Sequence, residues 1–368
     1  MGTHQHTTAR GPLIGALLVG LALGLALGSA RLAAADVSYI PIPEIITDPN
    51  EGATFGVLGV ALITDENDRV TYMVAPDVRY NKTKGVFPTF RLFGYPSENR
   101  DYSVTLGKST TKDEDYEAEF HDIGLLDGKA YFHGIAIYER DSTERFYGFG
   151  NRSSEHGEAN YTGANFHSQL NPGYYVLPHL AVGYKMRIRR YEVQRGQVDS
   201  GDVTDLVRCS RPHPAGTCPP LDGTLGLKTG DRRFPNIRPA DFGPDLYWAH
   251  RLSLTYDTRD VDDIPTEGAY SNLYVEAADR RLASAKSFVK FGGEWRGFIP
   301  LRAAKNPILA LRGLLDYTSG NRDLPFWEQH DLGGRRRLRG FGSNRFIDFN
   351  RSLMTAELRT KVYERHIF

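Results

Sequence analysis

The sequence predicts an all-β protein, a transmembrane antiparallel β-barrel of the outer-membrane type, and three observations support this prediction. Polar and apolar residues alternate with a period of two along most of the chain. After residue 35 no apolar run has the length that a membrane-spanning helix requires. The chain is also rich in aromatic residues, with 20 tyrosines and 19 phenylalanines among its 368 residues. Alternation with aromatic residues at strand ends is typical of barrels that cross a bilayer.

The first 35 residues are predicted to be a cleaved export signal. Arg10 precedes an apolar stretch that begins at Pro12, and the small residues Ala33 and Ala35 form an A-x-A cleavage site before Asp36. A membrane-anchoring helix is the alternative, but the glycines within the stretch favour a signal. Residues 36–368 then form one exported β-barrel domain, which we expect in the bacterial outer membrane.

The alternation is clear in "HLAVGYKMRIRRYEV", residues 179–193. Val182 and Tyr184 share one face of the strand, while Lys185, Arg187 and Arg189 share the other. A soluble sandwich would show the same pattern, but long strands and alternating short and long connections favour a membrane barrel. We predict about 12–14 strands in this chain. The expected ranges are 40–48, 52–64, 69–81, 86–95, 101–110, 115–123, 128–140, 161–174, 180–194, 245–257, 268–279, 286–299, 307–317 and 352–363.

Two cysteines lie in a long connection that we expect on the outer face. Cys209 and Cys218 end the segment "CSRPHPAGTC", and an oxidising compartment predicts a local disulfide between them. A zinc site that includes His213 is the alternative, but this spacing matches no common zinc pattern.

The segment "YDTRDVDDIPTEGAYSNL", residues 256–273, is predicted to be a hairpin. Its turn uses residues with turn-forming chemistry. These residues are Asp257, Arg259, Asp260, Pro265 and Gly268. The acidic side chains there, with Asp262 and Asp263, could instead bind calcium. A polar turn needs no metal, so we expect neither a metal nor another cofactor.

A second unusual segment is "DLGGRRRLRGFGSNRF", residues 331–346, in which Arg335, Arg336, Arg337 and Arg339 fall within five positions. No helix or strand pattern covers it, so it is predicted to be a loop. The simplest interpretation is a solvated tip or a patch for an anionic partner. Basic and acidic residues balance at 45 each over the whole chain, which gives no support to nucleic-acid binding.

Five segments together resemble the bacterial surface-antigen family, the superfamily of BamA- and TamA-like barrels that insert or export β-rich proteins. They are the 256–273 hairpin, "LGGRRRLRGF" at 332–341, "LMTAELR" at 353–359, "IPEIITDPNEGATFGV" at 42–57 and "RFYGFGN" at 145–151. The resemblance implies that the arginine-rich loop folds back into the barrel lumen. Arg339, Gly340 and Phe341 would then pack against the wall. Glu357 on the following strand would be the first acidic partner of Arg339, Gly340 would allow close backbone approach, and Phe341 would fill a gap.

The chain departs from this family in two respects. The family commonly has POTRA domains ahead of a barrel of sixteen strands, whereas few residues separate Ala35 from the first predicted strand, so no POTRA-recruited partner is expected. One strand follows the loop where the family has about four, which predicts a domain that is incomplete at its C-terminus. Two more strands are predicted before the arginine-rich loop than the family has there. We therefore expect one predicted hairpin to be absent.

The resemblance implies insertion or translocation of outer-membrane proteins, with outer-membrane lipid and unfolded or nascent proteins as partners. The chain has no recognisable catalytic motif, so we expect no enzymatic activity. One alternative is a passive pore for small solutes, in which basic lumen residues would favour anions. Those residues are Lys185, Arg187, Arg189, Lys290 and Arg296. Another alternative is a barrel domain that accompanies an exported enzyme.

Overall fold

One antiparallel sheet forms most of the protein in the computed structural model, which describes residues 36–48, 51–153, 159–196, 239–302, 306–320, 324–334 and 336–360. The first strands are β1 (Asp36–Asp48), β2 (Gly52–Thr64), β3 (Val70–Val74), β4 (Asp77–Asn81), β5 (Gly85–Ser97), β6 (Arg100–Lys108) and β7 (Glu114–Gly124). The middle strands are β8 (Ala130–Phe146), β9 (Ala159–Leu177), β10 (Leu180–Arg195), β11 (Asp245–Asp257) and β12 (Gly268–Ala278). The last strands are β13 (Phe288–Pro300), β14 (Ile308–Gly320), β15 (His330–Leu332), β16 (Phe346–Asp348) and β17 (Arg351–Arg359).

Short helical turns lie between the strands. They are α2 (Leu125–Gly128) and three 3₁₀ turns, η2 (Pro239–Phe242), η3 (Arg280–Leu282) and η4 (Phe326–Glu328). No helix in the part of the chain that the structure describes is long and apolar enough to cross a bilayer.

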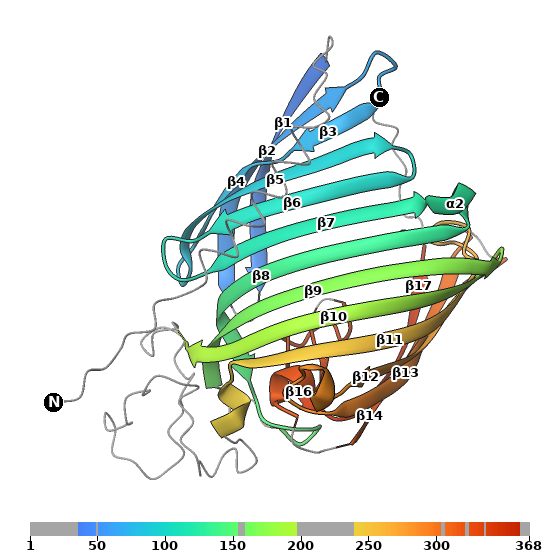
Figure 1. Cartoon of the computed structure of the whole chain (residues 1–368). Coiled ribbons are helices and arrows are strands. Elements are labelled where there is room, and N and C mark those ends of the chain that lie inside the picture. The colour runs from blue at the N-terminus through green and yellow to red at the C-terminus, as the bar shows by residue number, and fades with distance from the viewer. Residues whose placement is uncertain are drawn as a thin grey trace.

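The sheet is a meander in which each strand pairs with its neighbours in the chain. Figure 1 shows that it curves around, so that β12–β14 and β17 form the wall behind the earlier strands. Among the described residues, no backbone pairing joins β1 to β17. The separate pair β15–β16 belongs to the connection between β14 and β17.

The predicted strands are all present, and the all-β fold is confirmed. The range 69–81 is divided into β3 and β4, which both pair with β2 and β5 and therefore occupy one position in the sheet. The break falls at Ala75 and Pro76, where proline lacks the amide that a ladder requires. The sheet has fifteen strands, or fourteen positions when β3 and β4 are counted together. The expectation that one hairpin would be absent is wrong.

The two faces of the sheet have the polarity of a membrane barrel. Large apolar side chains point outward and are exposed. Examples are Val182, Leu252, Leu273, Phe291, Leu315 and Tyr317. Alternate positions such as Lys290 and Asp316 point inward and are buried. This is the reverse of a soluble sandwich, in which the buried face would be the apolar one.

The connections define the two ends of the sheet. The strands β8, β10 and β14, which precede the longest connections, all end at one end of the sheet, here called the long-loop end. The opposite end carries α2 and the β9–β10, β11–β12 and β13–β14 turns, and is called the short-turn end. Outer-membrane barrels place short turns toward the periplasm and long loops outside.

Candidate functional site

The connection between β14 and β17 folds into the curve of the sheet. Figure 1 shows β16 within that curve. Its 3₁₀ turn η4 belongs to the main buried cluster of the protein, together with Phe146 of β8, Tyr161 of β9, Tyr247 of β11 and Phe288 of β13. A bridge between Phe149 and Ile347, with the Gly150 amide donating to the Ile347 carbonyl at 2.8 Å, holds the β16 side of the loop. We call residues 321–350 the lumen loop.

Two aromatic side chains of η4 attach the lumen loop to the wall. The ring of Phe326 lies 4.7 Å from that of Phe146 and 5.5 Å from that of Tyr161. Trp327 stacks on Tyr191 at 4.8 Å, and its indole N–H donates to the Asp241 carbonyl at 3.0 Å. Both side chains are buried. Burial of each contributes roughly 1.5–3 kcal/mol of transfer free energy.

The next residue, Glu328, adds a charged anchor. Its carboxylate accepts from the Arg187 guanidinium at 2.6 Å and from the Lys290 ammonium at 2.9 Å. Arg189 approaches the carboxylate at 3.4 Å, and the Glu328 side chain is only 1% exposed. Burial opposes ionisation of this carboxyl, but Arg187 and Lys290 hold the pKa of Glu328 well below its usual range. Glu328 is therefore an ionised anchor inside the barrel.

The wall continues this network without the loop. Glu276 of β12 accepts from Arg187 at 2.8 Å and from Arg251 at 2.9 Å. Charged hydrogen bonds of this kind are stronger than neutral ones, and each arginine offers several donors. Arg187 of β10, Arg251 of β11 and Lys290 of β13 are thus paired with buried carboxylates.

A second row of ion pairs fastens the lumen loop at Asp331, three residues after Glu328. Arg337 binds Asp331 within the loop at 2.5 Å. Arg351 of β17 donates to the Asp331 carbonyl at 3.0 Å and to the Asp316 carboxylate of β14 at 2.5 Å. With η4 and the Phe149–Ile347 bridge, this contact joins the loop to the wall at three places along its length.

The residues that the family resemblance indicated are close together but are not the main anchor. The guanidinium of Arg339 lies 3.5 Å from the Glu357 carboxylate, and its side chain is 75% exposed. Arg359 shares the same carboxylate at 3.3 Å. The predicted pairing of Arg339 with Glu357 is therefore present, but the expected shielding is not, because the tip contacts β14 and β17 while the Arg339 side chain stays in water.

Gly340 and Phe341 also differ from expectation. Gly340 has φ +90°, a left-handed conformation that favours glycine, but a Cβ at this position would meet nothing within 4 Å. The glycine serves the backbone conformation and not a close approach. Phe341 contacts Phe346 at 5.5 Å and remains partly exposed, so its partner is the loop itself and not the wall. Arg335 lies outside the described residues.

The predicted hairpin at 256–273 is present as β11, a turn and β12. Arg259 binds the carboxylates of Asp257 at 2.6 Å and Asp262 at 3.0 Å. Asp260 accepts from the Thr266 hydroxyl and amide, and these bonds lower the pKa of Asp260 to about 2. Gly268 has φ +95°, and a Cβ there would lie 2.2 Å from the Thr258 carbonyl.

These contacts bear on the calcium alternative. Asp257 and Asp262 bind an arginine, and Pro265 is buried in the turn. Among the residues that the structure describes, no group of three or more His, Cys, Asp or Glu side chains could hold a metal ion. Cys209, Cys218 and the signal segment 1–35 fall outside the described residues.

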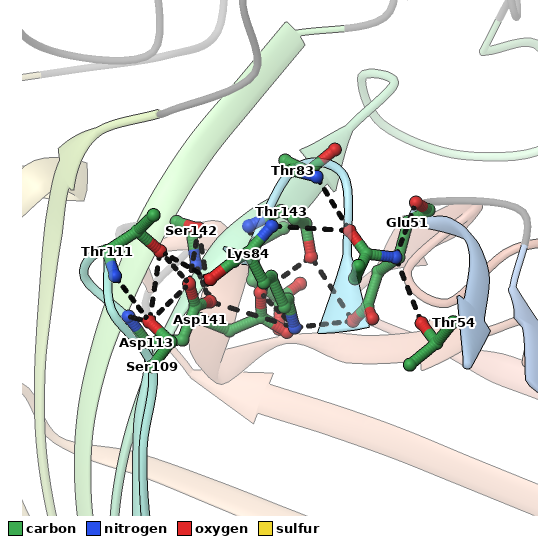
Figure 2. A network of polar contacts seen from close by, with 12 residues as sticks. Glu51, Thr54, Thr83, Lys84, Ser109, Thr111, Asp113, Asp141, Ser142 and Thr143 are labelled. Carbon is green, nitrogen blue, oxygen red and sulfur yellow. Dashed lines mark hydrogen bonds and ion pairs between the residues drawn. The ribbon is translucent and has the colours of Figure 1, made fainter. Parts of the chain in front are cut away.

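A second polar network, shown in Figure 2, lies at the long-loop end of the first eight strands. The Lys84 ammonium in the β4–β5 turn binds Glu51 at 2.5 Å, Asp141 at 3.3 Å and Asp113 at 3.7 Å. Burial opposes protonation of this amine, but the carboxylates, Asp141 and Glu51 first, raise the pKa of Lys84. The Ser142 hydroxyl donates to Asp113 at 3.0 Å. One lysine thus connects three turns and β8.

Sequence reasoning missed Glu328 and Lys84. Neither lies in a periodic segment, and the partners of Glu328 on β10 are more than 130 residues away in the chain. One usable signal was present: the inward-facing Arg187, Arg189 and Lys290 require buried acidic partners if the lumen is filled. The short segment "PFWE", residues 325–328, combines apolar residues with a glutamate and could have been identified as the source of such a buried acidic partner.

The Omp85 superfamily domain model matches residues 98–362. BamA from Haemophilus ducreyi lacking POTRA domains 1–3 aligns over 89% of this chain with 14% identity and a TM-score of 0.45. OmpT, an outer membrane protein of Vibrio cholerae, aligns over 90% of this chain and 99% of its own with 10% identity and a TM-score of 0.37.

The outer membrane channel DcaP of Acinetobacter baumannii aligns over 90% of this chain and 99% of its own, with 12% identity and a TM-score of 0.30. The chain spans 54% of the length of the BamA structure. No curated protein matches the sequence. The family model covers more than half of the chain, so the protein belongs to the Omp85 superfamily and is an outer-membrane β-barrel protein.

Proposed function

We propose that this barrel assists the insertion or translocation of other polypeptides at the outer membrane, without catalytic turnover. The family membership is consistent with this role, and one structural observation favours it over a passive pore. That observation is the attachment of the lumen loop to the wall through Phe326, Trp327 and Glu328.

The lumen loop argues against free passage of solutes because it occupies the inside of the sheet beside the basic residues. Arg187, Arg189 and Lys290 would attract anions in an open pore. All three bind Glu328. Arg296 pairs with Glu294 at 2.6 Å. The charges of Arg187, Arg189 and Lys290 thus stabilise the loop and are not free to select a permeating ion.

A loop held by buried ion pairs has a second consequence for function. Breaking such pairs is costly, so the loop stays seated through thermal fluctuations. The barrel can then perturb the surrounding bilayer through its apolar outer face without becoming leaky. A polypeptide-handling barrel needs this combination, whereas a solute pore does not.

The proposal is tested with proteoliposomes that contain the purified full chain. We expect an unfolded outer-membrane barrel added to them to fold several-fold faster than in empty liposomes or liposomes with an unrelated barrel of similar size. We also expect a small steady conductance in planar bilayers. No acceleration of folding together with a large open conductance, unchanged in Glu328→Gln, would establish the pore instead.

A further inference from the structure

Three neighbouring turns form a continuous rim at the short-turn end. They are the α2 turn, the β9–β10 turn and the β11–β12 turn. The Tyr175 amide donates to the Lys129 carbonyl at 2.8 Å, and the Asp257 amide donates to the His179 carbonyl at 2.9 Å. Figure 1 shows α2 at the same end of the sheet as the β9–β10 turn. The three turns are therefore one surface.

This surface exposes apolar side chains among acidic ones. Leu126 is 69% exposed, Leu177 61% and Ile264 72%. Val261 is also exposed, as are the acidic residues Asp127, Asp262 and Asp263. We call these seven residues the acidic apolar rim. Exposed apolar patches bordered by charge are characteristic of interaction sites.

The rim is preorganised. In the β11–β12 turn, Arg259 and Asp260 form internal hydrogen bonds to Asp262 and Thr266. Val261, Asp263 and Ile264 are left facing solvent. In the α2 turn, Leu126 and Asp127 both have left-handed backbone conformations, with φ 52° and 58°. A turn that is already ordered loses less entropy when it binds.

Charge decides between lipid and protein as the occupant. The segment 257–267 carries four aspartates and Glu267 against Arg259 alone. The Asp262 side chain is 87% exposed. Anionic headgroups repel such a turn, and seating Ile264 in the bilayer would bring Asp263 with it. A protein surface with basic side chains around an apolar pocket can bury the apolar side chains of the turn and pair with its acidic ones.

We propose that the acidic apolar rim is the docking surface for a periplasmic protein whose apolar pocket is bordered by lysine or arginine. The short-turn end faces the periplasm in barrels of this type. Ile264 and Val261 fill the pocket, and Asp263 pairs with its basic border. This docking does not depend on the insertion role, because it uses a different part of the protein.

The first part of the test places the photoreactive residue benzoylphenylalanine at position 264, 261 or 282 of the full chain in cells. Leu282 is a matched control, since it is exposed but lies in η3 at the opposite end. We expect one periplasmic protein, identified by mass spectrometry, to be attached at positions 261 and 264 and not at 282. We expect Asp263→Asn to reduce this adduct several-fold.

The second part measures binding of that protein, once purified, to the barrel in nanodiscs. Ile264→Ser should weaken its affinity about tenfold or more, whereas Leu282→Ser should leave it unchanged. Heat-modifiable migration on gels shows that each variant is folded. Adducts with lipid alone, adducts with a second copy of this chain, no adduct at 264, or equal affinity for the two serine variants would each overturn the proposal.

Discussion

The two halves of the lumen differ in how they hold charge. Along β10–β13, behind the lumen loop, Arg187, Glu276 and Lys290 are buried and paired with one another or with Glu328. Along β6–β8, Asp101 and His121 are 49% and 45% exposed and lie 3.7 Å apart. Both walls are polar, but the lumen loop covers the first and, among the described residues, contacts the second only at the end of β8, through Phe146 and Glu144.

This difference shows that polar residues on a barrel wall do not by themselves define a permeation path. The same inward-facing arginine is a pore lining in an open barrel and a docking site for a loop in a filled one. In the uncovered half, order comes instead from Lys84, which connects the turns at the long-loop end (Figure 2). The following predictions test whether the loop or the wall provides the stability of each half.

The largest effect is expected at Glu328. Glu328→Gln keeps the shape of the side chain but leaves Arg187, Arg189 and Lys290 facing an uncharged amide. Removing one partner of a buried ion pair costs about 3–5 kcal/mol. This loss is measured as the change in the free energy of unfolding in detergent, with tryptophan fluorescence as the signal. Glu98→Gln in the exposed β5–β6 turn is the control. A loss no larger than that of the control would show that the loop is not anchored by charge.

Lys84→Met should have the next largest effect, because it leaves Glu51, Asp113 and Asp141 close together without their shared cation. We expect a loss of about 1–3 kcal/mol, since the network is partly open to water. Hydrogen exchange should increase in the β1–β2 hairpin more than in β12–β13. Lys129→Met, an exposed lysine of the α2 turn, should change neither quantity. Uniform exchange across both regions would contradict a local clamp.

The strand pattern was predictable from the sequence because lipid on one face and water on the other impose a period of two on every strand. The error at 69–81 has a local cause, Pro76, which interrupts the ladder without interrupting the alternation. The attachment of the lumen loop was not predictable in the same way. Glu328 is an anchor only because Arg187 and Lys290 bind it, and the curvature of the sheet is what brings those residues within reach.

The family motif also directed attention to Arg339, although this chain uses a different segment of the same loop. A motif transfers the course of the backbone more reliably than the contacts of a side chain. Here the loop does lie against the wall, and Arg339 does lie near Glu357. The aromatic and acidic residues of η4 make the buried contacts.

Lowering the pH should destabilise the covered half through His330. Burial, reinforced by Lys290, lowers the pKa of His330 to about 4, and the side chain contacts the Thr318 hydroxyl at 3.0 Å. The folded state holds this histidine neutral, while the unfolded chain protonates it near pH 6.5. The contribution of neutral His330 to the free energy of unfolding is therefore complete above pH 6.5 and decreases as the pH falls toward 4. We expect a loss of about 1 kcal/mol between pH 7.5 and 5.5.

His330→Gln should remove that part of the pH dependence, because glutamine does not titrate. The measurement is the free energy of unfolding of both proteins at each pH. His121→Gln, at an exposed position of β7, provides the comparison for a histidine that water can reach. Identical pH profiles for the wild type and His330→Gln would exclude His330 as the titrating group.

The smallest effect is expected at the loop tip. Arg339 and Glu357 are 3.5 Å apart, but the arginine is 75% exposed and Arg359 already shares the carboxylate. Exposed ion pairs contribute about 0–1 kcal/mol, and a second cation reduces the loss further. Arg339→Ala should therefore cost less than about 0.5 kcal/mol. Arg337→Ala should cost more, because its 2.5 Å pair with Asp331 lies next to Arg351.

A double-mutant cycle of Arg339→Ala and Glu357→Ala sharpens this comparison. Nearly additive losses in unfolding free energy would agree with a solvated tip. The stability losses would then decrease from Glu328 to Arg337 to Arg339, as the burial of these side chains decreases. A coupling of about 2 kcal/mol or more would require a shielded pair. The tip would then have to close onto β17 in the membrane, and stability would be shared between both ends of the loop.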